Sequence, residues 1–298
     1  MNIDTSKLIA LTALALLSMS AAAEDTPRSS MRKGLKAYKG GAYTNAVRHL
    51  EKTALEFPAI GNYNLGNAQY RTGDFEAAET SFNEALRTSD LELQAKAYFN
   101  RGNALLARTT ALTKTEEISL AIELSFQAMD MYEKAILLLP DDLMAKQNFE
   151  RAGALRLQLE YNRGRWYFNQ AESLLPQYKA KDAKQNYQLA KKQFEHILAN
   201  VDTDHAESKQ YLPKIDARLE MLALAVEAAE IDLKTALQYI SDYQYMLATQ
   251  RLTTETDERK YAFDIKPDLK KKYEETIQKN QEILKIIQDL FPTMNIVQ

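Results

Sequence analysis

The sequence predicts an all-α protein in which three to four helical hairpins stack as a solenoid and long C-terminal helices follow. Glycine and proline are scarce, with 9 and 7 residues among 298, and no run of alternating β-branched residues indicates a strand. The pattern Asn-x-Gly-Asn-Ala occurs twice, and its glycines, Gly66 and Gly102, are 36 residues apart. A repeat of this size is typical of stacked helical hairpins, because one hairpin cannot bury its apolar face alone.

The first hairpin is expected to contain helices over residues 31–39 and 43–57, with the break between them at Gly40-Gly41. Pro58 is expected to end the second helix, because proline lacks a backbone donor and its ring clashes with the preceding turn.

The second hairpin is expected over residues 60–72 and 75–88, with a break between its helices at Gly73-Asp74. Small residues, Gly66 and Ala78, stand where the two helices cross closely. Bulky side chains are expected to fill the space around that crossing: Tyr70, Phe82 and Leu86. A glycine, an alanine and a leucine occupy the matching positions 32 residues earlier, so the first two hairpins are in register.

The third hairpin begins near Leu91, and its helices are expected to be longer. From Gly66 to Ala78 there are 12 residues, whereas from Gly102 to Ala128 there are 26. Fourteen extra residues shared equally would lengthen each helix by about two turns, or ~10 Å. A loop is the alternative, but the apolar residues of this stretch keep helical spacing, which favours longer helices: Ile118, Ala121, Ile122 and Phe126.

A capping box formed by Thr113 and Glu116 is expected to start the second helix of this hairpin. The helix is expected to end at Leu139-Pro140.

A fourth, degenerate hairpin is predicted next, with similarly enlarged helices. Its first helix opens near Ala145 and runs unbroken to Leu175, and Pro176 lies in the turn. Gly164 and Ala190 are again 26 residues apart, which matches the third hairpin.

Beyond Asn200 the repeat pattern is lost while helical periodicity continues. Asp202-Thr203-Asp204 is expected to cap a short helix, Pro213 to start a long one, and residues 253–257 to form a loop. The last helix starts at Pro267, since proline is favourable in a first turn. Its apolar stripe suits a helix that caps the stack, and equally one that awaits a partner: Leu269, Tyr273, Ile277, Asn280, Leu284, Ile287 and Phe291.

Residues 1–23 are predicted to be an export signal. Lys7 precedes the apolar run Leu8–Met19, and small residues at Ala21 and Ala23 match the preference for cleavage. The run of about a dozen residues is too short to span a bilayer comfortably. The expected location is therefore the periplasm, and the alternative is an uncleaved signal that anchors the protein to the cytoplasmic membrane.

Composition excludes several classes of function. The net charge of −3 offers no basic footprint for nucleic acid. The absence of cysteine excludes disulfides, thiol catalysis and cysteine-ligated zinc. No cofactor is expected, and no further membrane span follows the signal.

The hairpin motifs resemble the tetratricopeptide repeat (TPR) superfamily over residues 31–140, with weaker similarity to about residue 200. The phrases YNLGNAQYRTGDFEAAETSFNEAL, LELQAKAYFNRGNAL and LLPDDLMAKQNFERA resemble the exported TPR proteins of bacterial aerotolerance (Bat-type) operons. The resemblance implies TPR repeats over residues 24–140, a degenerate hairpin over 141–200 and a long-helix region over 201–298. It also implies partners that are membrane-anchored proteins with von Willebrand A domains, beside a MoxR-type ATPase.

The TPR resemblance implies that the inner faces of the first ("A") helix of each hairpin bind a partner polypeptide. Amides and guanidinium groups can hold a peptide backbone or a carboxylate, while tyrosine and phenylalanine add contact area at little entropic loss. The candidate residues are Tyr63, Asn67, Arg71, Lys96, Phe99, Asn103, Tyr161, Arg165 and Asn169. The alternative is that Asn67 and Asn103 form local hydrogen bonds between helices and Tyr63 is a packing residue.

The family's carboxylate clamp is only partly matched. Asn67 and Asn100 fit its pattern, but Tyr63 stands where the first lysine belongs, and amides or Met144 occupy the other cationic positions. A chaperone-type acidic C-terminus is therefore not the expected ligand.

Nothing in the sequence predicts catalysis. The histidines His49, His196 and His205 are scattered, helix capping explains Asp202 and Asp204 better than a metal does, and no catalytic or nucleotide-binding fingerprint is present. We expect a non-catalytic scaffold. The alternatives are a structural subunit that docks through its C-terminal helices, and an enzyme with an unrecognised site in residues 203–298.

Overall fold

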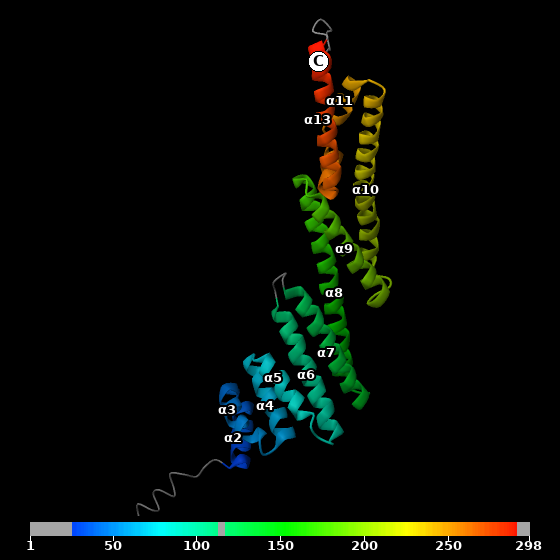
Figure 1. The fold of residues 1–298 in the computed structure, drawn as a ribbon. Helices are drawn as coiled ribbons and strands as arrows, with labels where there is room; N and C mark the ends of the chain where they lie inside the picture. Colours follow the sequence, from blue (N-terminus) through cyan, green and yellow to red (C-terminus); the bar gives the residue numbers. More distant parts are fainter. Residues whose placement is uncertain (1–25, 113–116, 291–298) are drawn as a thin grey trace, which may run out of the picture. The chain divides into compact units, whose positions relative to one another are not determined.

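The computed structural model describes residues 26–112 and 117–290, and all regular secondary structure in these ranges is helical, as predicted (Figure 1). The export signal at 1–23, the Thr113–Glu116 capping box and Phe291 lie outside the described residues. The contacts divide the chain into two compact units, residues 1–156 and 157–298.

The first unit is a stack of three helical hairpins in which each helix packs against the next. The hairpins are α2 (Pro27–Lys39) with α3 (Tyr43–Ala54), α4 (Pro58–Thr72) with α5 (Phe75–Ala85), and α6 (Leu91–Ala111) with α7 (Ile118–Leu138). The long helix α8 (Leu143–Leu174) begins in this unit, and Phe149, Ala152 and Leu155 pack onto the third hairpin.

Prolines set two of these boundaries differently from the prediction. Pro27 and Pro58 each stand in the first turn of a helix, where their missing N–H would have no partner in any case. Helix α2 therefore starts before residue 31. Pro58 starts α4, while α3 has already ended at Ala54.

Each hairpin is held at one close crossing, where a glycine of the first helix lies against a large buried side chain of the second. A Cβ added to Gly66 would lie 2.8 Å from the ring of Phe82, and one added to Gly102 would lie 2.7 Å from the ring of Tyr132. Gly34 faces Leu50 in the same way. All three large side chains are at most 1% exposed, so none of them can move aside.

The third hairpin is enlarged by longer helices, as predicted, and not by a loop. Helices α6 and α7 have 21 residues each, whereas α4 and α5 have 15 and 11. The longer helices enlarge the hydrophobic core around Tyr132, where Leu105, Leu124 and Met131 are buried.

The second unit begins with the predicted fourth hairpin. Its first helix is the later part of α8, which runs through 32 residues without a break. A 3-10 turn (Leu175–Gln177) containing Pro176 leads to α9 (Ala180–Asn200). The same crossing recurs here, because a Cβ on Gly164 would lie 2.7 Å from the ring of Phe194.

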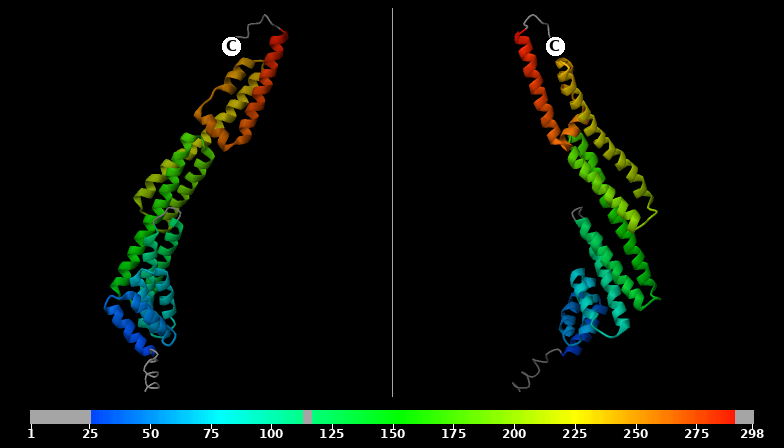
Figure 2. Two further views of the ribbon diagram at one scale, coloured as in Figure 1. Left: turned by 90° about the vertical axis from the view of Figure 1, so that its left-hand side faces the viewer. Right: turned by 45° about the vertical axis from the view of Figure 1, so that its right-hand side comes forward.

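Four further helices complete the second unit, and the views in Figure 2 show α10 as the longest of them. They are α10 (Ala206–Ser241), α11 (Tyr245–Thr253), α12 (Asp257–Ile265) and α13 (Pro267–Leu290). The separate helices α11 and α12 were not predicted. The expected loop is present but spans only residues 254–256, and the start at Pro267 is confirmed.

The prediction that Pro213 starts a new helix is wrong. Helix α10 passes through Pro213 and has 36 residues. His205 caps it, since Nδ1 of His205 accepts from the backbone N–H of Ser208 at 3.2 Å. Pro213 lies on the exposed side, so the carbonyl of Lys209 that loses its helical partner can bond to water instead.

The predicted stripe of α13 is buried in its first half. Leu269, Tyr273 and Asn280 are at most 4% exposed, while Leu284 and Ile287 are half-buried. Helix α13 packs against α10, α11 and α12. Among the described residues, no helix is both long enough and apolar enough to span a bilayer.

Substituting two glycines of the first unit by alanine should change the free energy of unfolding in opposite directions, because only one of them lies at a close helix crossing. Gly102→Ala should lower the free energy of unfolding by about 1–3 kcal/mol, because Tyr132 has no room to shift. Gly153→Ala, whose Cβ would meet only Met129 at 3.6 Å, should raise it by up to about 1 kcal/mol. Urea unfolding followed by circular dichroism measures both. Equal effects of the two substitutions would contradict the role of the crossing.

Candidate functional site

Asparagine side chains form a hydrogen-bonded row across three neighbouring A helices of the first unit, α4, α6 and α8. Nδ2 of Asn100 donates to Oδ1 of Asn67 at 2.9 Å, and Nδ2 of Asn148 donates to Oδ1 of Asn103 at 2.8 Å. Within α6, Nδ2 of Asn103 donates to Oδ1 of Asn100 at 3.3 Å. We call Asn67, Asn100, Asn103 and Asn148 the asparagine ladder.

Two tyrosines complete the ladder. Nδ2 of Asn100 also donates to the hydroxyl of Tyr63 at 3.3 Å, and the hydroxyl of Tyr132 donates to Oδ1 of Asn103 at 2.9 Å. Burial raises the pKa of Tyr132, so its hydroxyl stays protonated and remains a donor.

The glycine crossings place these asparagines. Asn67 follows Gly66 and Asn103 follows Gly102, and one residue further along a helix is turned by about 100°. While each glycine faces its own second helix, the asparagine after it therefore faces the neighbouring A helix. The ladder is a consequence of the repeat geometry.

The ladder is half-buried and keeps unused donors. Each asparagine amide has two N–H donors. Asn100 uses both, whereas Asn103 and Asn148 use one each, and Nδ2 of Asn67 makes no hydrogen bond to any described residue. The face can therefore donate hydrogen bonds to a bound molecule without breaking its own network.

Tyr63 and Phe99, both predicted binding residues, are also packing residues. The ring of Tyr63 lies 6.1 Å from that of Phe82, and the ring of Phe99 lies 5.9 Å from that of Tyr132. Their half-buried edges are all that a partner could contact.

The two cations predicted for this face already have partners. Lys96 is exposed and pairs with Glu92 one turn earlier, and this hydrogen bond raises the pKa of the Lys96 ammonium. Arg71 donates to the Tyr43 hydroxyl at 2.9 Å, beside the turn between α2 and α3. Among the described residues, neither of them forms a hydrogen bond to the asparagine ladder.

The remaining predicted residues belong to the second unit. Arg165 is exposed and its guanidinium lies 5.6 Å from the centroid of the Tyr161 ring, while Asn169 is exposed one turn further along α8. Tyr161 itself packs against Phe194, His205 and Tyr211. It is a core residue of that unit.

Asn100, Asn148 and Tyr132 are part of this face although the predicted set omitted them. The spacing of 33 residues between Asn67 and Asn100 is close to one repeat and could have indicated the first contact. The tyrosine hydroxyl and Asn148 could not be found in this way, because the enlarged hairpin changes the spacing.

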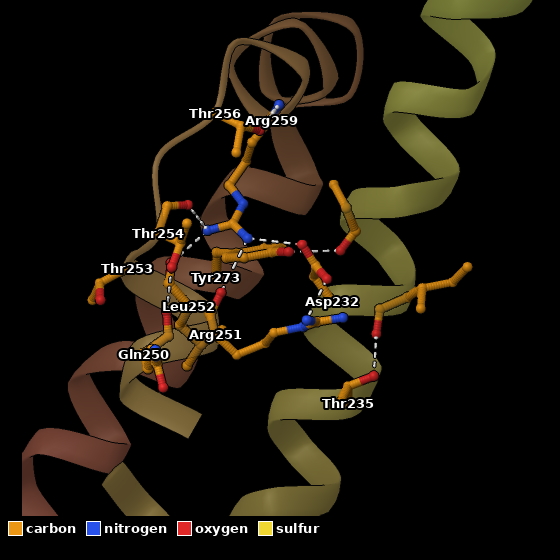
Figure 3. A network of polar contacts seen from close by, with 12 residues as sticks. Asp232, Thr235, Gln250, Arg251, Leu252, Thr253, Thr254, Thr256, Arg259 and Tyr273 are labelled. Atoms are coloured by element: carbon orange, nitrogen blue, oxygen red, sulfur yellow. Dashed lines mark hydrogen bonds and ion pairs between the residues drawn. The ribbon is translucent and has the colours of Figure 1, made fainter. Parts of the chain in front are cut away.

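The polar centre of the second unit is Arg259, which is 7% exposed (Figure 3). Its guanidinium donates to the carbonyls of Arg251 and Leu252 at 3.0 Å, to the carbonyl of Thr254, and to Oδ2 of Asp232 at 2.8 Å. The carbonyls of Arg251 and Leu252 belong to the last turn of α11 and have no partner within their helix, and Thr254 is the residue directly after it. Arg259 therefore joins α10, α11 and α12.

Tyr273 of α13 completes this centre. Its ring lies 5.1 Å from the guanidinium of Arg259, and its hydroxyl donates to the carbonyl of Ala229 at 2.7 Å. Burial raises the pKa of Tyr273 to about 12. The fourth helix is thus tied to the same network.

Charged residues line one hollow of about 440 Å³ beside this network, but they form structural pairs. Lys260 lies over the ring of Tyr178 at 4.6 Å, and Asp264 accepts from the backbone N–H of Lys181 at 2.7 Å. Lys270 pairs with Glu274 on its own helix. In the described ranges, no group of three or more histidine, aspartate or glutamate side chains could hold a metal ion.

No family model matches the chain, and no curated protein matches it. A crystal structure of a TPR repeats protein from Bacteroides fragilis NCTC 9343 is similar to this chain with a TM-score of 0.30 and 12% identity, covering 87% of this chain and 99% of that chain.

Removing the Arg259 guanidinium should destabilise the second unit. Arg259→Met would leave three carbonyls without their donor and Asp232 with Arg251 as its remaining ion-pair partner, and we expect a loss of about 3–5 kcal/mol. Lys270→Met, which removes only a surface pair at 3.8 Å, should change the free energy of unfolding by less than about 1 kcal/mol. Hydrogen exchange of α11 and α12 measures the difference. Unchanged protection in Arg259→Met would show that the network is dispensable.

Proposed function

We propose that this protein is a non-catalytic scaffold that binds a partner polypeptide on the A-helix face of its first unit. The observation that carries this proposal is the asparagine ladder, a half-exposed row of amides that extends over three helices and keeps unused N–H donors. Amide groups are complementary to the carbonyls of an extended peptide.

The chemistry of this face favours a peptide backbone over a terminal carboxylate as its ligand. Lys96 already pairs with Glu92, and Arg71 bonds to Tyr43 away from the ladder. The neutral donors of Asn67, Asn103 and Asn148 and the edges of Tyr63 and Phe99 remain for the ligand. This face would therefore recognise a peptide through hydrogen bonds and aromatic contacts.

We further propose that the protein is exported and that its partners are membrane-anchored proteins with von Willebrand A domains. Support comes from the sequence alone: the apolar run Leu8–Met19 followed by Ala21 and Ala23, and the resemblance of residues 31–140 to Bat-type TPR proteins. A periplasmic scaffold could present such a partner to other proteins of the cell envelope.

Two substitutions test the proposed binding face while each remaining asparagine keeps a hydrogen bond to a tyrosine. In Asn67→Ala, Asn100 still donates to Tyr63, and in Asn148→Ala, Asn103 still accepts from Tyr132. When the double variant is purified from the native envelope, the amount of co-purifying partner should fall by about tenfold or more, as expected from two lost hydrogen bonds.

The matched control is Asn186→Ala on α9, whose amide donates only to the carbonyl of Asp182 on the same helix. It should retain the partner. Equal recovery of the partner by the double variant and the wild type, with unchanged melting, would refute the proposed face.

Export predicts a processed N-terminus. Protein purified from the periplasmic fraction should begin at Glu24, as measured by intact mass, because Ala21 and Ala23 occupy the cleavage positions. Replacing Ala23 with a bulky residue should block cleavage and retain the chain in the membrane. A full-length mass in wild-type membranes would favour the anchored alternative.

A further inference from the structure

Helix α10 carries a second apolar stripe on the side opposite its buried one. The buried stripe, which packs into the second unit, includes Ile215, Leu222, Ala229, Leu233 and Ala236. The second stripe steps by four, three, four and three residues through Ala217, Met221, Leu224, Ala228 and Ile231. This spacing is that of the core positions of a coiled coil.

The second stripe faces solvent. Leu224 is 54% exposed and Ile231 is 52% exposed, and Ala217 and Ala228 are also exposed. A helix on the surface of a folded unit normally has a polar outer face. Met221 is half-buried against the core of the unit. Single exposed apolar residues are common, but the other four members of the stripe are exposed in register over four turns.

The stripe borders a groove of about 380 Å³ between α10 and the start of α12. Its lining includes Ala217, Met221, Leu224 and Ala228 from the stripe, and Glu258 from α12. Alanines at two of the stripe positions leave space for the side chains of another helix to insert. The groove therefore has room for apolar side chains of a docked helix.

The charges around the groove are acidic. Glu220 and Glu258 line it, and Glu227 lies on α10 one turn after Leu224. All three are exposed and form no ion pair within residues 26–112 and 117–290. The nearest lysines of α10, Lys214 and Lys234, lie beyond the two ends of the stripe. A partner segment with basic residues on both sides of its apolar positions would neutralise these carboxylates.

We propose that this α10 groove is a docking site for an amphipathic, basic α-helix of another protein. The partner helix would place apolar residues at three- and four-residue steps over Leu224 and Ile231, and lysine or arginine beside Glu220, Glu227 and Glu258. A second copy of this chain fits less well. Antiparallel pairing of α10 about Leu224 would place Glu220 of one copy beside Glu227 of the other, and like charges repel.

This site lies in the second unit and does not depend on the asparagine ladder. Failure of either proposal would leave the other unaffected.

Fluorescence anisotropy with the full chain and two model peptides tests the proposal. Each peptide is a helix of roughly 20 residues with leucine and isoleucine at the heptad core positions, and the flanking positions are lysine in one and glutamate in the other. The lysine peptide should bind at least about tenfold more tightly than the glutamate peptide, and its affinity should fall with added salt.

Variants of α10 locate the binding. Leu224→Ser combined with Ile231→Ser should lower the affinity for the lysine peptide by about tenfold or more, because the bound peptide would bury both side chains. Leu237→Ser is the matched control, since Leu237 is 50% exposed on the same helix but lies outside the stripe. This substitution should leave the affinity for the lysine peptide unchanged. None of the three substitutions should change the melting temperature of the protein.

Charge reversal makes the test independent of packing. Glu220→Lys combined with Glu227→Lys should reverse the preference, so that the glutamate peptide binds more tightly. Equal affinity for both peptides, or no binding of the lysine peptide, would overturn the proposal. So would a dimer in sedimentation experiments that Leu224→Ser with Ile231→Ser dissociates, because the occupant would then be a second copy.

Discussion

The close approach of a glycine to a large buried side chain is the constraint on which the hairpins of this protein depend. Gly66 against Phe82 and Gly102 against Tyr132 bring two helices closer than any side chain at the glycine would allow. The same contact turns the next residue, Asn67 or Asn103, towards the neighbouring A helix. A packing requirement inside one hairpin thus contributes to the row of amides that links α4, α6 and α8, and the proposed binding face is a consequence of the fold.

The helices after α9 are organised by a different interaction. The described part of α10 to α13 contains no glycine, and a buried arginine takes the central position instead. Arg259 satisfies the free carbonyls at the end of α11 and pairs with Asp232, while Tyr273 lies against its guanidinium. A charge buried to this degree is stabilised only with its partners in place, so the arrangement of these helices is sensitive to single substitutions.

The two kinds of interaction explain which parts of the structure could be predicted from the sequence. The glycine crossing repeats, so the hairpins, the lengthened third hairpin and the contact of Asn67 with the next A helix could be predicted from spacing. A single proline was misleading, because Pro213 lies on the exposed side of α10, where a lost hydrogen bond is replaced by water. The partners of Arg259 are backbone carbonyls, which have no signature in a sequence. The two cations predicted for the binding face, Lys96 and Arg71, bond to Glu92 and Tyr43 instead, and these pairings depend on side-chain reach rather than on the repeat.

Helix α10 has one apolar side that packs into the second unit and another with apolar residues exposed to solvent. One apolar stripe through Leu222 and Leu233 is sufficient to hold the helix in the second unit, because those side chains are buried. On the other side of the helix Leu224 and Ile231 are about half exposed, and exposing apolar surface to water is unfavourable. The amide face of the first unit would bind through hydrogen bonds, whereas the α10 groove would bind through apolar contacts bordered by carboxylates. A peptide chosen for one chemistry is poorly suited to the other, so the two proposed surfaces would select different partners.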